Sequence, residues 1–257
     1  MADALAAEWA KLRSVRSTYF VFAVLGGVLA LVALLSFQVA HLWDRANLDQ
    51  RATVSVASLP EVAGWLAQLC LGVLGVLAIS GEFSTGAIRG SLLAVPRRGS
   101  LFAAKALAVG TVALAGGSAV TLGAYAISHL VLGDRPIEGY VDDRFPLAVT
   151  SGLGAMVFAL VAFGLATLMR NAAAAIATLV ALWWLLPMLL QLLPATGGRD
   201  WAYSLLLLSL PRQAAGLDAM AGTYDAKLPP WAAFLVLAAY AAGALSAAAL
   251  SFRRRPF

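Results

Sequence analysis

Residues 62–80 read VAGWLAQLCLGVLGVLAIS, an apolar run without a charged side chain. A helix of about 20 residues crosses roughly 30 Å of hydrocarbon, so this run is long enough to span a membrane. Five further apolar runs lie on either side of it, at residues 19–43, 106–132, 145–169, 172–193 and 231–252. Because these runs lack the alternation of barrel strands, the sequence predicts an all-α polytopic membrane protein with six transmembrane helices.

The composition agrees with this prediction. Hydrophobic residues make up 61% of the 257 residues and charged residues only 12%, against about 25% charged residues in soluble proteins. The connections between the runs are too short and too apolar to form a separate soluble core. We therefore expect a single transmembrane domain over residues 1–257.

The charges between the runs predict an orientation. With the N-terminus in the cytoplasm, the inner side receives eleven Lys and Arg residues and three acidic residues, and the outer side seven basic and ten acidic residues. Basic residues in short loops stay on the cytoplasmic side of a membrane, so we expect both termini there. The basic residues are scattered at helix ends, which does not indicate a nucleic-acid partner.

An amphipathic helix is predicted before the first span, over residues 3–17. Leu5, Trp9, Leu12 and Val15 recur at helical spacing, and the charged residues fall mostly on other faces. Such a stripe is typical of a helix that lies in the membrane interface, with its basic residues directed toward anionic lipid.

The connection at residues 81–105 reads GEFSTGAIRGSLLAVPRRGSLFAAK. Its pattern predicts a short membrane-surface helix that Ser84 or Thr85 would cap and Pro96 would stop. Glu82 would accept a hydrogen bond from a basic residue or from backbone donors at the membrane edge. The residues alone leave two interpretations open, a helix that plugs into a cytoplasmic partner and a tight hairpin whose arginines only set the topology.

These features together resemble the membrane subunit of an ABC-2 type ATP-binding-cassette exporter from a bacterial plasma membrane. The resemblance rests on the N-terminal segment AEWAKLRSVRSTYF, the six spans and the segment SGEFSTGAIRGSLLAVPRRGSLFAAK after the second span. It implies a re-entrant segment before the last span, at about residues 198–228, where WAYSLLLLSLP is too short to cross the membrane.

The same resemblance implies a coupling element that meets an ATPase. The residues that match it are Glu82, Phe83, Ser84, Thr85, Gly86, Ile88 and Arg89. The chain has no GxxxxGK[ST] run and no Gly-Lys dipeptide, so we expect no cofactor on this chain and assign ATP and Mg²⁺ to the partner ATPase. The family pattern implies two ATPase subunits and two permeases, the second a copy of this chain or a paralogue.

Uncharged polar side chains inside the spans are candidates for contact with cargo, and they are Gln38, Gln68, Thr121, Tyr125 and Gln191. Side chains of this kind also hydrogen-bond neighbouring helices, so packing is an equally available interpretation. The apolar walls suit a hydrophobic or amphiphilic cargo such as a drug, an antibiotic, a peptide or a lipid.

Other classes of protein fit the sequence less well. An ion-driven carrier usually places ionisable side chains at mid-span, and none is found there. No hydrolase motif is present, so we expect no enzymatic activity in this chain. A non-transporting immunity or sensing subunit and a passive channel remain as alternatives.

Overall fold

The structure is a computed structural model that describes residues 2–47, 51, 58–87, 98–133, 135, 137, 145–194, 197–217 and 228–254. In these residues the regular structure is entirely helical. The elements are α1 (Ala2–Ser14), α2 (Arg16–Arg45), α4 (Leu59–Thr85), α6 (Arg98–Leu132), α7 (Phe145–Met169), α8 (Ala172–Val180), the π-helical η2 (Ala181–Leu185), α9 (Leu186–Gln191), α10 (Gly197–Ser204), α11 (Leu210–Ala214) and α12 (Pro230–Arg254).

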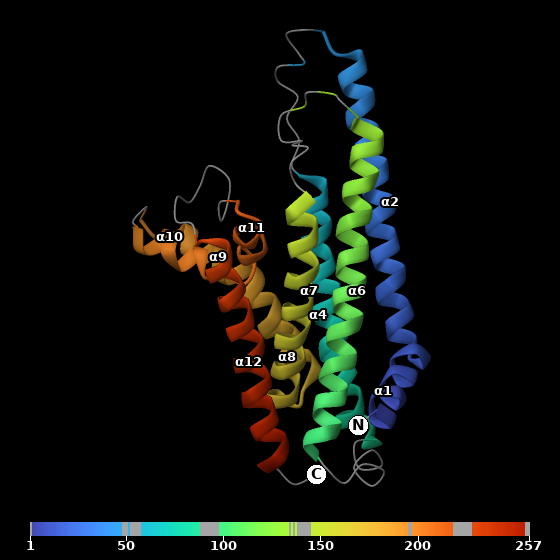
Figure 1. Cartoon of the computed structure of the whole chain (residues 1–257), viewed down its shortest axis with the longest axis vertical. Coiled ribbons are helices and arrows are strands. Elements are labelled where there is room, and N and C mark those ends of the chain that lie inside the picture. The colour runs from blue at the N-terminus through green and yellow to red at the C-terminus, as the bar shows by residue number, and fades with distance from the viewer. Residues whose placement is uncertain are drawn as a thin grey trace.

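The described residues contain six helical segments that are long and apolar enough to cross a membrane, which confirms the predicted fold class. These spans are α2, α4, α6, α7, the continuous segment α8–η2–α9, and α12. Figure 1 shows them running roughly side by side, with α2 at one edge of the bundle and α12 at the other. The helix α1 and the last turn of α12 lie at the same end of the bundle, which we call the α1 end.

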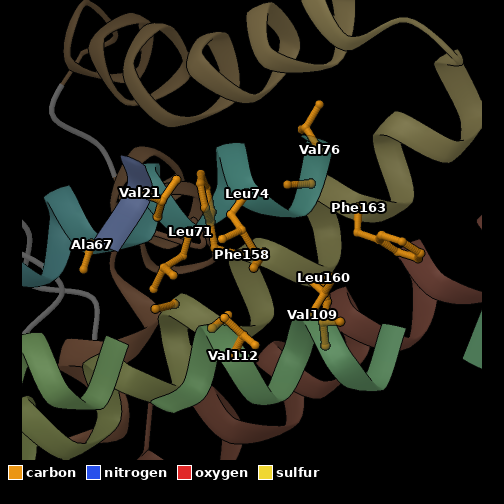
Figure 2. Close-up of a cluster of buried hydrophobic side chains, with 14 of the residues drawn as sticks. Val21, Ala67, Leu71, Leu74, Val76, Val109, Val112, Phe158, Leu160 and Phe163 are labelled. Carbon is orange, nitrogen blue, oxygen red and sulfur yellow. The ribbon is translucent and has the colours of Figure 1, made fainter. Parts of the chain in front are cut away.

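The helix α7 lies at the centre of the bundle and contacts α4, α6, α8, α11 and α12. Figure 2 shows apolar side chains from α2, α4, α6 and α7 pointing toward one another, among them Leu71, Val109, Phe158 and Phe163. Close approach of backbones supports this contact, since a Cβ atom added to Gly75 would lie 2.4 Å from the carbonyl oxygen of Ala159. Small residues that let helices approach are typical of membrane bundles.

The fifth span is not a regular α-helix. Its backbone becomes π-helical over Ala181–Leu185, and Pro187 follows two residues later. Hydropathy predicts one continuous apolar run over residues 172–193, because it carries no signal for a change in hydrogen-bonding register. Single π-helical turns inside membrane helices are often found at functional positions.

Two short helices, α10 and α11, lie between the fifth and sixth spans. Arg212 of α11 forms a buried ion pair with Glu61 at the start of α4, and the Thr150 hydroxyl of α7 donates to the carbonyl oxygen of Pro211 at 2.7 Å. The Gln213 side chain donates to the carbonyl of Ser204 at 2.7 Å and accepts from the backbone N–H of Leu228 at 2.8 Å. The contacts of Arg212 and Pro211 fix α11 against α4 and α7, and the bonds of Gln213 join α11 to α10 and to the residues before α12.

Candidate functional site

The predicted coupling segment begins inside the last turn of α4. The helix continues through Thr85 and ends at Gly86, whose φ of 70° leaves the right-handed helical region. The hydroxyls of Ser84 and Thr85 donate to the carbonyl oxygen of Gly81, at 3.0 and 2.8 Å. The helix α6 begins at Arg98, so the connection between the two helices is shorter than the predicted 81–105.

Four charged side chains from three helices meet at this point, and we call them the charge quartet: Glu8 and Lys11 of α1, Glu82 of α4 and Lys105 of α6. The Lys11 ammonium donates to Glu8 at 2.9 Å and to Glu82 at 3.0 Å. The Lys105 ammonium donates to Glu82 at 2.8 Å and also to Glu8. The quartet therefore joins the N-terminal helix to the second and third spans at the α1 end of the bundle.

Burial differs within the quartet. The side chains of Lys105 and Glu8 are 5% and 4% exposed, that of Glu82 13%, and that of Lys11 43%. Burial would by itself lower the pKa of Lys11, but its bonds to Glu8 and Glu82 outweigh burial and raise that pKa above its usual value. The quartet consists of two lysines and two glutamates, so each charge that is removed from water has an opposite charge beside it.

The quartet changes our expectation for one basic residue of α1. Of the predicted apolar stripe, Trp9 and Val15 are 40% and 47% exposed, whereas Leu12 packs against the core, and Ala4 and Glu8 are buried on another face. Lys11 is therefore directed to Glu8 and Glu82, and not simply to lipid. Sequence analysis missed Glu8 and Lys105 as site residues, although the spacing of Ala4 and Glu8 by one helical turn was a weak sign of a buried face.

Phe83 links the coupling segment to a second connection at the same end. The guanidinium of Arg170 lies over the Phe83 ring, 5.6 Å from its centroid, and such contacts are attractive. Arg170 sits between α7 and α8 with a φ of 54°. Ser84, Thr85 and Gly86 are exposed, whereas the predicted coupling residues Ile88 and Arg89 lie outside the described residues.

The family profile described as ABC-2 family transporter protein matches residues 4–190, which run from α1 to the end of the fifth span and include the whole quartet. The chain belongs to this ABC-2 family. No curated protein matches the sequence. Membership identifies the ABC-2 protein as a membrane permease, and permeases of this family work with a separate ATPase.

Two of the five predicted cargo residues of the ABC-2 protein are buried between helices. Gln68 is 2% exposed, and its side-chain oxygen accepts from the indole N–H of Trp183 in η2 at 3.5 Å. Thr121 is 1% exposed and donates to the carbonyl oxygen of Ala148 at 2.7 Å, which joins α6 to α7. Both side chains therefore have partners within the permease.

The other three predicted cargo residues lie nearer the surface of the ABC-2 protein. Gln38 of α2 and Gln191 of α9 are exposed, and Tyr125 of α6 is half-buried with its ring stacked on His129, the centroids 6.1 Å apart. The five residues thus come from different faces of the bundle. Within the described residues no group of three or more His, Cys, Asp or Glu side chains forms a candidate metal site.

Proposed function

We propose that the chain is the transmembrane subunit of a bacterial plasma-membrane exporter that moves a hydrophobic or amphiphilic cargo outward. A separate pair of ATPase subunits drives it, and the permease acts as a dimer with a second copy or a paralogue. Both termini face the cytoplasm. The observation that carries the proposal is the charge quartet, because it ties the segment expected to meet the ATPase to three helices at once.

In this proposal the quartet transmits a displacement of the coupling segment to α1, α4 and α6. Removing one partner of a buried ion pair leaves an uncompensated charge, so α1, α4 and α6 stay together at the quartet when the segment after Thr85 is displaced. Phe83 carries the same displacement to Arg170 and hence to the start of the fifth span. We assign the exposed residues Ser84, Thr85 and Gly86, with Ile88 and Arg89, to contact with the ATPase.

We also propose that the polar side chains within the spans contact the cargo. Gln68 lies beside the π-helical η2, so re-packing of the fifth span would expose its amide toward the centre of a dimer. Gln38, Thr121, Tyr125 and Gln191 would contact cargo at other stages of passage. Re-packing of this kind is compatible with the small residues at the contacts between α4, α6 and α7.

Co-purification tests the proposal. We expect the tagged chain, extracted in mild detergent, to bring down a stoichiometric protein with Walker motifs and ATPase activity. Thr85→Arg should abolish this recovery, because it places a bulky cation on the proposed contact surface, while the fold is retained since a cation at a helix C-terminus is favourable.

The matched control is Asn47→Arg, which adds the same side chain at the exposed end of α2, away from the coupling segment. It should recover the ATPase as the unmodified chain does. A clean preparation of the unmodified chain without any ATPase would overturn the exporter function and favour a sensing subunit or a channel.

A further inference from the structure

A cleft of about 720 Å³ opens beside the charge quartet, between α1, the start of α2, α4 and α6. Its volume lies within the range of about 300–1,000 Å³ that is usual for small-molecule sites. The cleft borders the exposed surface that we assign to the ATPase, because Thr85 belongs to both, whereas Ser84 and Gly86 do not line the cleft. It is large enough to take a ligand of its own.

The lining of the cleft is amphiphilic. All four side chains of the quartet lie at one part of it, and its walls are formed by apolar residues such as Leu74, Leu77 and Val109. Leu74 precedes Glu82 by eight residues on the same helix, which places it about 12 Å along the axis, toward the middle of the bundle. The cleft therefore matches a molecule with one charged group and an apolar tail that extends along the spans.

The charges of the quartet balance, but one hydrogen-bond donor is missing from it. One carboxylate oxygen of Glu82, Oε1, accepts from both Lys11 and Lys105. The other, Oε2, is buried, and no donor from the described part of the chain reaches it. A buried acceptor without a donor is unfavourable, and the terminal torsion of a glutamate is soft, so a donor that enters the cleft can engage this oxygen by a small rotation.

We propose that the cleft binds the primary ammonium group of an amphiphile, with N–H donors on Glu82 Oε2 and the tail along Leu74, Leu77 and Val109. A charged donor is held more strongly by a carboxylate than a neutral one. Two sources share this chemistry, a lipid with an aminoethyl headgroup and a soluble alkylamine. The inference does not rest on the proposed ATPase coupling, because the site is complete within this chain.

Paired alkylamines test the ammonium. We would measure equilibrium binding of radiolabelled dodecylamine and dodecyltrimethylammonium to the purified full-length chain at neutral pH. The tail and the charge are the same, but only the primary amine has N–H donors. We expect it to bind at least about tenfold more tightly. Equal affinities would overturn the proposal.

A wall variant tests the position of the site. Ala78 is half-buried and lines the cleft, so Ala78→Phe fills the space and leaves the four charges in place. Binding of dodecylamine should fall about tenfold or more. Glu61→Gln is the control, because it alters another buried glutamate, which pairs with Arg212 away from the cleft, and it should bind dodecylamine normally. Unaltered binding by Ala78→Phe would contradict the proposal.

Lipid nanodiscs distinguish the two sources. Discs made of phosphatidylethanolamine or of phosphatidylcholine with identical acyl chains differ only in whether the headgroup carries N–H donors. Weaker binding of dodecylamine in the phosphatidylethanolamine discs would identify the lipid headgroup as the resident ligand. Equal binding in both discs would identify the soluble amphiphile.

Discussion

At the scale of single residues, Lys105 is the most constrained charge in the described structure of α6. Its ammonium bonds two glutamates and its side chain is 5% exposed. Lys11 bonds the same two glutamates but is 43% exposed. The two lysines therefore share their chemistry and differ in burial, which makes them a matched pair for measuring what the quartet contributes.

We expect Lys105→Met to lower the free energy of unfolding by about 3 kcal/mol or more, since it leaves buried carboxylates without their main partner. Lys11→Met should cost about 1 kcal/mol or less, because the lysine side chain is 43% exposed and both glutamates keep their ion pairs with Lys105. Unfolding in dodecyl sulfate, followed by circular dichroism, measures both. Equal losses would show that burial does not distinguish the two lysines.

Gln68 and Gln38 form a second matched pair. Gln68→Leu removes the acceptor for the Trp183 indole and should cost about 1 kcal/mol, because the bond is long at 3.5 Å. Gln38→Leu changes an exposed side chain on α2 and should be neutral. The same unfolding assay applies, and an equal loss in Gln38→Leu would remove the special role of the bond to Trp183.

Sequence reasoning reached only part of this site. It identified Glu82 and the kind of group that Glu82 accepts from, since a carboxylate at the end of an apolar run needs a partner. It placed Lys105 merely among the topogenic cations and gave Glu8 no role. Glu8 and Lys105 are 97 positions apart, and the contact depends on how α1 lies across α6, which no local pattern contains.

At the scale of elements, the contact between α4 and α7 depends on backbone proximity. Gly75→Ala would place a Cβ atom 2.4 Å from the Ala159 carbonyl oxygen, and we expect a loss of about 1–3 kcal/mol from overpacking. Gly26→Ala is the control, since nothing lies within 4 Å of its added Cβ. It should be neutral or slightly stabilising. Thermal aggregation in detergent measures both, and similar behaviour would mean that the two helices adjust freely.

The element boundaries show what hydropathy can and cannot predict. The run at 145–169 has the bounds of α7, whereas α4 and α6 extend well beyond their apolar runs, to Thr85 and back to Arg98. Hydropathy marks the part of a helix that suits lipid. The polar turns at the ends of α4 and α6 are held by tertiary bonds such as those of Glu82. Hydropathy does not register such bonds, so it does not predict these turns as helical.

At the scale of the whole molecule, α1 and the last turn of α12 lie at the same end of the bundle, and we predict that this end faces the cytoplasm. Cys70 is the only cysteine, so a Cys70→Ala background accepts single labels. We expect Asn47→Cys, at the other end of α2, to react with an impermeant maleimide in intact cells. Ala10→Cys, exposed on α1, should react only after permeabilisation. The reverse pattern would invert the protein in the membrane.

The π-helical turn of η2 has a consequence for the whole fifth span. It holds one residue more than an α-helix of the same height needs, so it acts as a phase shift of about 100° between α8 and α9. Deleting Leu182 would return the segment to α-helical register and rotate Pro187 and Gln191 to a new side, while the first half kept its contacts. The rotational position of α9 relative to α8 is thus set by a single extra residue in the span.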